Sequence, residues 1–538
     1  MVFLYKKCAL DTNDKFGRFV LAAEDIKAGE LLLSESPLVC GPYWDCPMNC
    51  LNCYAPSDTT CKKCKVVPLC WNCYDSHNAI ECETLKKLEL PDTFLIDNFG
   101  VVTPLRVLLL FYRYAEQNAR ANGATATDDL KYQIDELMCM ESHCDKRHGT
   151  WIWNEHAKNV IQPLRSINID AKFQSLNAPW TLTDDFLQKL CGILDVNTME
   201  VRTKHFEEFP VRGLYTQAAL LAHDCIGNTF ISVDNNKQLK VYASLDIKMG
   251  EIVYSNYTAS LYGTEARQEH LTKGKYFECE CSRCMDPTEF GTHLSSMRCQ
   301  SCTMGYMIRM DGKTTWKCLN CNTNVPSEQI QLILRDIRLQ VQQISPNIER
   351  IELLITKYTQ ILHPNHYLLI ELKQKLAAVI RHMSATAYDN ATNSFVSAAA
   401  ATNAVSSNQR ILSPLENLLQ RKIDLCEEFI PLLNILQPGI SRLRAIAMYE
   451  QFAPLVQLAR LQHQQKIITD AEYLHQLNEA EKIAKESIGM LLYEPATNPE
   501  GMLAKQAMYE LKELRIIRQR IEKIMKKKSS AHKITTKA

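Results

Sequence analysis

The segment LLAHDCIGN, residues 220–228, is the stretch from which the rest of the chain is interpreted. Its apolar beginning, from Ala218 to Leu221, is typical of a buried strand end that runs into a tight polar turn. Four side chains in the turn have metal-binding or catalytic chemistry: His223, Asp224, Cys225 and Asn228. We therefore expect a functional site around this turn.

A second cluster, YFECECSRC at residues 276–284, complements the turn. Its cysteines, Cys279, Cys281 and Cys284, are one ligand short of a tetrahedral zinc site. Cys225 is the candidate for the fourth ligand. A zinc ion bound by all four would hold the later segment against the turn, and we expect a pocket where the two segments meet.

Residues 50–82 contain seven cysteines and one histidine at metal-ligand spacing, a density that is difficult to explain without zinc. Eight ligands suit two zinc ions. The candidate ligands are Cys50, Cys53, Cys61, Cys64, Cys70, Cys73, His77 and Cys82. Cys46 lies just before this set and could substitute for one member.

Residues 299–321 have the spacing of a four-cysteine zinc ribbon. Two Cys-x-x-Cys pairs are separated by fifteen residues: Cys299 with Cys302, and Cys318 with Cys321. Trp316 lies beside the second pair and could cover the site. A weaker candidate metal set, in a segment that is otherwise expected to be helical, comprises Cys139, His143, Cys144 and His148.

The composition of the 538 residues limits the classes of function. Lys+Arg and Asp+Glu both number 61, and this balance argues against broad binding to nucleic-acid backbones. No segment approaches the ~18 apolar residues that span a membrane. Because residues 1–7 also lack a signal-peptide core, we expect the 22 cysteines to be thiols or metal ligands.

The remaining segments give a coarse secondary structure. Residues 16–39 are expected to form a β-hairpin that turns at Lys27–Glu30. Residues 91–170 are expected to be helical, with Thr103 as an N-cap before Pro104. Residues 326–528 show helical periodicity, interrupted by a stretch at 384–408 with few bulky side chains that is expected to be a mobile loop.

Taken together, these motifs resemble the SMYD family of SET-domain protein-lysine methyltransferases, in which a MYND zinc module interrupts the SET domain. The resemblance rests on the central turn, the Cys-x-Cys-x-x-Cys cluster, and two N-terminal signals, Ile26-x-x-Gly29-Glu30 and Glu35-x-Pro37. The ribbon makes the chain more similar to the arthropod SmydA branch.

The resemblance implies an α+β fold with a split, β-rich SET domain and an all-α, TPR-like C-terminal domain. The expected parts are an N-terminal SET part at 1–45, a MYND module at 46–90, a helical insert at 91–170, the SET core at 171–258, a post-SET zinc segment at 259–287, the ribbon at 288–325 and the TPR-like domain at 326–538. MYND modules interleave their ligands, which would pair Cys50, Cys53, Cys70 and Cys73, and separately Cys61, Cys64, His77 and Cys82.

The resemblance also implies an activity, S-adenosylmethionine-dependent methylation of lysine in a histone or another protein, in the cytoplasm and nucleus, with a role in transcriptional regulation. Tyr257 would be the catalytic channel tyrosine. The cofactor would be contacted by Gly17, Arg18, Asn197, Ala222, His223, Tyr257 and Phe277. A strand at 194–201 would carry Asn197. The four zinc ions would be structural, and the MYND module would bind proline-rich peptides.

Three positions depart from the family pattern: Phe19 replaces a glycine, Ala222 an asparagine and Lys275 a second channel tyrosine. Losing one hydrogen bond to a charged ligand costs about 1.5–3 kcal/mol, which weakens cofactor binding without abolishing it. An alternative is therefore a zinc-rich scaffold that binds partners through the MYND module and the helical domain. A sequence-specific DNA-binding finger protein is not expected, because the chain is not basic.

Overall fold

Two units, each assembled from several chain segments, make up the computed structural model. The model describes residues 5–120, 128–176, 178–203, 205, 208–310, 314–395 and 413–535. The first unit comprises Met1–His223, Asn228–Ser255 and Leu271–Phe277. The second comprises Asp224–Gly227, Asn256–His270 and Glu278–Ala538. Each unit has its own buried apolar clusters.

The first strands of the first unit are β1 (Cys8–Asn13) and β2 (Gly17–Ala22), an antiparallel hairpin. The Asn13 side chain accepts the backbone N–H groups of Lys15 and Phe16, which closes the turn. Gly17 has φ +63°, a left-handed conformation that glycine adopts without strain.

The expected hairpin over residues 16–39 is wrong in its pairing. The return strand, β3 (Leu31–Glu35), pairs with β11 (Leu239–Ala243), which pairs in turn with β10 (Thr229–Val233). The segment before β3 instead meets a similar Asp-Ile-Lys segment at 246–248. Ile26 bridges Ile247, and the Lys27 ammonium pairs with Asp246 at 2.7 Å. This pairing of two similar segments directs the chain away from β2.

A second sheet has the order β4 (Val39–Pro42), β8 (Val211–Leu214), β7 (Thr198–Val201). The expected strand over 194–201 is half right. Helix α9 (Asp184–Asn197) continues through Asn197, and only the last four residues of that range are extended. Asn197 therefore lies at a helix end, where its amide donates to the Ile193 carbonyl at 2.9 Å.

The apolar approach to the central turn is a 3₁₀ helix, η3 (Ala218–Leu220), and not the expected strand end. The buried carboxylate of Glu35 accepts the backbone N–H groups of Gln217 and Ala218, both at 2.9 Å. These bonds satisfy N–H groups at the start of the helical turn and so favour it over an extended segment. The turn then enters β9 (Ala222–His223), which pairs in parallel with β12 (Tyr254–Ser255).

The region expected to be helical at 91–170 is mainly helical in its described residues, 91–120 and 128–170, which confirms that prediction. Its elements are α2 (Phe94–Asp97), η1 (Phe99–Val101), α3 (Val102–Arg120), α4 (Asp128–Met138), α5 (Cys144–Arg147), α6 (Trp151–His156), the π-helical η2 (Ala157–Ile161), α7 (Gln162–Ser166) and α8 (Ile169–Gln174). The N-cap assigned to Thr103 is wrong, because α3 begins at Val102 and the Thr103 hydroxyl donates to the Pro42 carbonyl at 2.7 Å.

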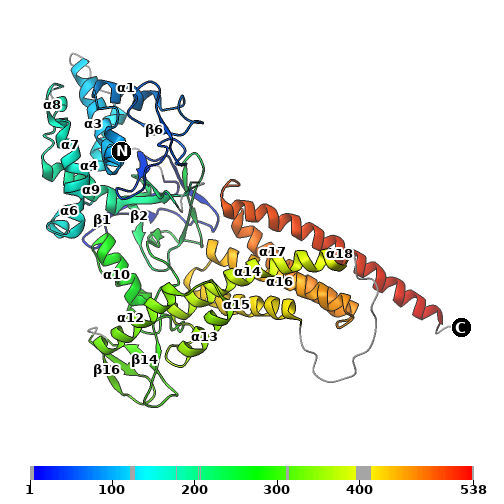
Figure 1. Cartoon of the computed structure of the whole chain (residues 1–538). Helices are drawn as coiled ribbons and strands as arrows, with labels where there is room; N and C mark the ends of the chain where they lie inside the picture. The colour runs from blue at the N-terminus through cyan, green and yellow to red at the C-terminus, as the bar shows by residue number, and fades with distance from the viewer. Residues whose placement is uncertain are drawn as a thin grey trace. The chain divides into compact units, whose positions relative to one another are not determined.

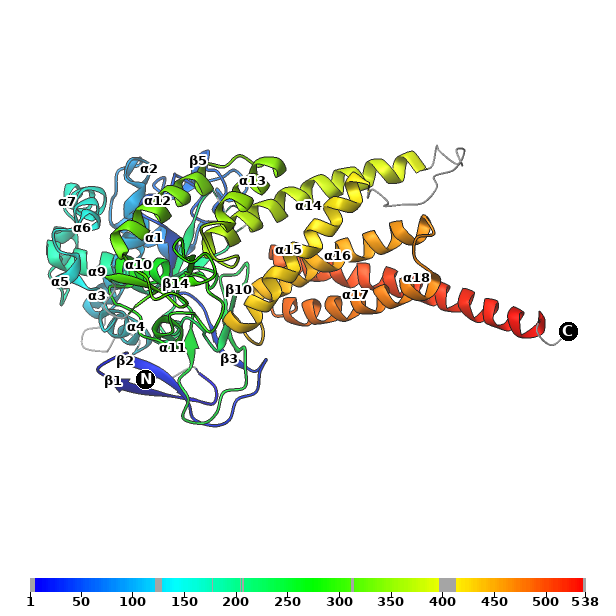
Figure 2. The ribbon, with the colours of Figure 1, turned by 90° about the horizontal axis from the view of Figure 1, so that it is seen from below.

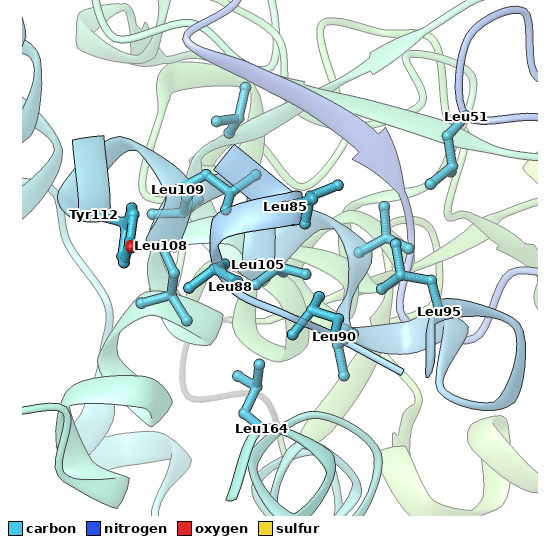
Figure 3. Close-up of a cluster of buried hydrophobic side chains, with 14 of the residues drawn as sticks. Leu51, Leu85, Leu88, Leu90, Leu95, Leu105, Leu108, Leu109, Tyr112 and Leu164 are labelled. Carbon is cyan, nitrogen blue, oxygen red and sulfur yellow. The ribbon is translucent and has the colours of Figure 1, made fainter. Parts of the chain in front are cut away.

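The core of this region is packed around α3 (Figure 3). Leu105, Leu108, Leu109 and Tyr112 repeat at helical spacing and are all buried. Leucines from the MYND-like module share this cluster, including Leu51 and those of α1 (Ala79–Lys87) and the loop that follows it. The module itself contains only a short pairing of β5 (Thr59–Thr60) with β6 (Pro68–Leu69).

In the second unit, α11 (Ser282–Met285) precedes a four-stranded antiparallel sheet. Its strands are β13 (Met297–Arg298), β14 (Tyr306–Arg309), β15 (Thr315–Cys318) and β16 (Asn324–Pro326). Helix α10 (Thr264–Lys275) begins in the second unit and ends in the first.

Where the rest of the second unit is described, it is built of helices joined by short connections, which confirms the prediction for those residues after 326. The helices are α12 (Ser327–Gln343), α13 (Ile348–Thr359), α14 (Tyr367–Phe395), α15 (Pro414–Leu436), α16 (Arg442–Gln464), α17 (Asp470–Leu491) and α18 (Pro499–Thr535). From α14 onward, consecutive helices lie side by side (Figures 1 and 2). Capping boxes at Ser413 and Thr469 begin α15 and α17.

The loop expected at 384–408 is wrong for its first part. Helix α14 continues to Phe395, and this stretch contains alanines but neither glycine nor proline, so nothing in it breaks a helix. Residues 396–408 lie outside the described residues. Among the helices that are described, none combines the length and apolar character needed to cross a bilayer.

We predict that Leu108→Ala destabilises the first unit by about 2–5 kcal/mol, because it leaves a cavity at a side chain with 1% exposure. Denaturant unfolding followed by fluorescence measures this change. The control is Ile80→Ala, at a side chain in α1 that is 53% exposed, with an expected change of about 0.5 kcal/mol or less. Equal effects of the two variants would contradict the position of this core.

Candidate metal centres and cofactor site

Four tetrads of cysteine and histidine have ligand atoms that converge to within 4.8 Å of one another. They bring together all sixteen residues that the sequence indicates as ligands, in the expected groups. A tetrahedral site with Zn–S bonds of about 2.3 Å has sulfurs about 3.8 Å apart. Seven of the separations between ligand atoms, at least one in each tetrad, are 3.5–3.9 Å. The tetrads therefore fit zinc in both donor type and spacing.

The first two tetrads are interleaved within the MYND-like module. One comprises Cys50, Cys53, Cys70 and Cys73, and the other Cys61, Cys64, His77 and Cys82. Nδ1 of His77 faces Cys64 Sγ at 3.7 Å, and its Nε2 lies 3.5 Å from the Glu81 carboxylate. Glu81 is held by Arg106 at 2.8 Å. Such a carboxylate orients the imidazole toward a metal ion.

The third tetrad joins the central turn to the later cluster and comprises Cys225, Cys279, Cys281 and Cys284. Cys225 Sγ lies 3.9 Å from Cys279 Sγ and 3.5 Å from Cys284 Sγ. The backbone carbonyl of Cys225 accepts the Asn256 amide at 3.1 Å, which fixes the turn from a second side. This tetrad lies entirely within the second unit.

The fourth tetrad is the ribbon, with Cys299, Cys302, Cys318 and Cys321. The ring of Trp316 is 3% exposed and belongs to the apolar cluster that contains Cys299 and Cys318, in keeping with its expected covering role. The backbone N–H groups of Asn320 and Cys321 point at Cys318 Sγ at 3.4 and 3.5 Å. All four ligand positions in each tetrad are taken by protein, so zinc bound there would be structural.

The spare candidates are not in any tetrad of the described residues. Cys46 accepts the Asn49 amide at 3.4 Å. Cys139, His143, Cys144 and His148 do not converge on a common point either. The rings of His143 and Tyr276 lie 5.2 Å apart, and those of His148 and Trp153 lie 5.0 Å apart. These histidines pack against aromatic rings.

Two of the expected cofactor contacts, His223 and Phe277, are brought together in the first unit. The rings of His223 and Phe277 lie 5.8 Å apart, and the Phe277 ring is 37% exposed. The Lys275 ammonium donates to the carbonyl of Val196, the residue before Asn197. The Asn197 amide also donates to the Glu141 carbonyl at 2.8 Å. An exposed aromatic face next to amide and carbonyl groups fits a nucleoside-bearing ligand such as S-adenosylmethionine.

The expected N-terminal contacts, Gly17 and Arg18, lie at the start of β2. Arg18 pairs with Glu136 at 3.0 Å. The Phe19 ring is 3% exposed and packs edge-to-face on Phe16, whose ring lies 6.1 Å from that of Tyr254. Because Tyr254 is the β-partner of Ala222, the β1–β2 turn approaches the strand next to the central turn. Ala222 is itself buried, at 8% exposure.

Tyr257 belongs to the second unit and follows the end of β12 by two residues. Its side chain is half-buried, and burial raises the pKa of the phenol. Lys275 shows the opposite direction, since burial lowers its pKa to about 8. The departure at Lys275 was visible in the sequence, but its contact with Val196 was not, because no spacing rule relates the two positions.

Comparisons with known proteins give a consistent set of relatives. SET domain-containing protein SmydA-8, isoform A, of Drosophila melanogaster is 28% identical over 58% of this chain and 64% of its own length. Histone-lysine N-methyltransferase ASHR1 of Arabidopsis thaliana is 23% identical over 62% and 68%. This chain thus spans less than two thirds of SmydA-8. No protein-family model matches.

Among solved structures, the SET domain of LSMT bound to lysine and AdoHcy aligns with 83% of this chain and 88% of that chain. The sequence identity is 12% and the TM-score 0.23, which is too low to support a shared overall arrangement.

We predict four zinc ions per chain, measured by elemental analysis of the purified folded protein. Because the tetrads share no ligand, Cys302→Ser should lower the count by one. Cys46→Ser is the matched control and should leave the count unchanged, since Cys46 lies outside the tetrads. A wild-type count of three or fewer would contradict the assignment.

Proposed function

The chain is a relative of the SET proteins of the SMYD type and resembles their SmydA branch, and from that premise we propose that it is an S-adenosylmethionine-dependent protein-lysine N-methyltransferase. The observation that carries the proposal is the contact between the rings of His223, at the start of the central turn, and Phe277, two residues after the Lys275 that donates to the Val196 carbonyl. Three segments far apart in the sequence supply these groups. The names of the relatives agree with this activity.

Methylation of lysine sets two requirements on the site. Free lysine has a pKa of about 10.4, so the substrate amine must lose a proton before it reacts. Its nitrogen must also be held in line with the methyl group that S-adenosylmethionine supplies. We assign His223, Phe277 and Asn197 to cofactor binding, with Gly17, Arg18 and the Ala222 backbone as further contacts.

We assign Tyr257 to the substrate amine. Burial raises the pKa of its hydroxyl, so the phenol stays protonated at neutral pH and acts as a hydrogen-bonding group rather than as a base. We assign Lys275 no catalytic role. Its ammonium is engaged by the Val196 carbonyl in the part of the site where the family has a second channel tyrosine.

The proposed substrate is a lysine-containing protein or peptide, a histone or a non-histone protein, and the proposed location is the nucleus and cytoplasm, with a role in chromatin regulation. Two relatives are named histone-lysine methyltransferases, which supports the nuclear part. Binding of proline-rich peptides by the MYND-like module is proposed from the family resemblance alone.

A second candidate function, a scaffold without methyl transfer, is favoured by one observation. The buried ring of Phe19 stands at the family's glycine position and packs into the β1–β2 turn, where it fills space close to the backbone. If that space is needed by the cofactor, binding is lost while the zinc modules and the helical domain keep their partners.

We predict that Ala222→Asn tightens binding of S-adenosylmethionine about tenfold, near 1.4 kcal/mol, because it restores a polar side chain next to His223. Isothermal calorimetry on the full chain measures this. The variant Phe19→Gly with Ala222→Asn removes the ring as well, and thermal melting checks that it folds. No heat of binding from the folded double variant at millimolar cofactor would exclude the enzyme and leave the scaffold.

We predict that Tyr257→Phe leaves the affinity for cofactor within about twofold but lowers methyl transfer to a lysine peptide by about tenfold or more, since one hydroxyl contact to the amine is lost. Transfer is measured with labelled cofactor and the affinity by calorimetry. Tyr262→Phe, at a tyrosine that is 46% exposed, is the control and should change neither quantity. Equal loss in both variants would contradict the role of Tyr257.

A further inference from the structure

A buried guanidinium lies directly against the tetrad of the central turn. Arg267, on α10, has 0% exposure. Its Nε donates to Cys225 Sγ at 3.2 Å and its Nη2 to Cys284 Sγ at 3.3 Å. Arg267 is not one of the sixteen ligands, and no cysteine or histidine spacing in the sequence indicates it.

The remaining donors of Arg267 are also engaged. Nη2 reaches the Thr264 hydroxyl at 3.1 Å, while Nη1 reaches the Tyr262 carbonyl and the Glu289 carboxylate, both at 2.6 Å. A guanidinium has five N–H groups in a rigid plane, and here five acceptors surround it. This arrangement fixes the orientation of the two N–H groups that face sulfur.

Glu289 holds Arg267 in place from the side opposite the sulfurs. It is fully buried and accepts a second guanidinium, Arg283, at 2.9 Å, as well as the Ser295 hydroxyl at 2.6 Å. Nε of Arg283 also donates to Glu289 at 3.1 Å, while Nη1 and Nη2 reach the Ser260 and Tyr262 carbonyls. The two arginines thus share one carboxylate, but the contacts to sulfur come from Arg267.

The charge of a zinc–thiolate site explains why a guanidinium next to it is stabilising. A zinc ion with four thiolates carries an excess of negative charge, and in a buried site water cannot screen it. Arg267 places a positive charge directly against two of these sulfurs. In the ribbon, by contrast, Cys318 receives neutral backbone N–H groups, from Asn320 and Cys321. Charge-assisted hydrogen bonds are shorter and roughly twice as strong as neutral ones.

We propose that Arg267, positioned by Glu289, keeps zinc in the Cys225 tetrad. It offsets the negative charge on the sulfurs of Cys225 and Cys284, which lowers their reactivity toward electrophiles and slows the loss of zinc from this site. Outer partners of metal ligands commonly change metal affinity by about 10- to 100-fold. The role does not depend on methyl transfer, so it stands or falls apart from the proposed enzyme activity.

The first test uses the unmodified protein and compares two sulfurs of one tetrad. Cys281 and Cys284 are both half-buried, but Arg267 contacts Cys284. Under limiting N-ethylmaleimide, peptide mass spectrometry should show Cys281 alkylated at least about fivefold faster than Cys284. Equal rates, or faster alkylation of Cys284, would overturn the proposal.

The second test measures zinc release to 4-(2-pyridylazo)resorcinol from the full chain. In Arg267→Gln and Arg267→Lys, one zinc ion of the four should leave about tenfold faster than in the wild type. Lysine keeps the charge but lacks the planar fork that reaches two sulfurs and Glu289 together. Arg283→Gln is the matched control, because it removes the second arginine bound to Glu289 but no contact to sulfur. Zinc release from this variant should follow the wild type.

The proposal would be overturned if both Arg267 variants released zinc at the wild-type rate. It would also be overturned if Arg283→Gln accelerated zinc release as much as the Arg267 variants. The second result would mean that Arg267, Glu289 and Arg283 affect zinc release only through the stability of the fold. If the Arg267 variants do not fold, the alkylation rates of Cys281 and Cys284 in the wild-type protein alone decide whether the proposal stands.

Discussion

The structure depends on two sets of contacts that fix the turn at residues 222–228, one made by Cys225 and one by Asn228. On one side Cys225 shares a tetrad with cysteines more than fifty residues later in the chain. On the other, the Asn228 side chain donates to the Ile252 carbonyl and accepts the Tyr254 N–H at 2.9 and 2.7 Å. The segment that carries His223 is therefore constrained without a long strand of its own, since β9 has only two residues.

Zinc sites supply order where the chain lacks an apolar core of its own. The MYND-like module pairs only four residues in strands, and the ribbon sheet is built from strands of two to four residues. Such small modules bury too little apolar surface to fold alone, and metal binding offsets the deficit. Their cysteines also join the neighbouring leucine-rich clusters, so each metal site is continuous with a core.

The sequence was informative where the signal was local. Ligand pairs two or three residues apart, the apolar repeat of α3 and the helices after 326 all follow from short-range spacing. Prediction from the sequence was wrong where a residue far away along the chain determines the local structure. The buried Glu35 turns residues 218–220 into a 3₁₀ helix, β11 takes the pairing with β3 that was expected for β2, and the Pro42 carbonyl accepts the hydroxyl of Thr103. The contacts of Arg267 and Lys275 are of the same long-range kind.

The division into two units has a consequence for how this protein can change over time. The chain passes from one unit to the other after residues 223, 227, 255, 270 and 277, the fourth passage lying inside the continuous helix α10. No single break within residues 224–277 leaves both units whole. Because the two units are interleaved along this stretch, the turn, its metal ligands and the residues around His223 must be inherited as one block.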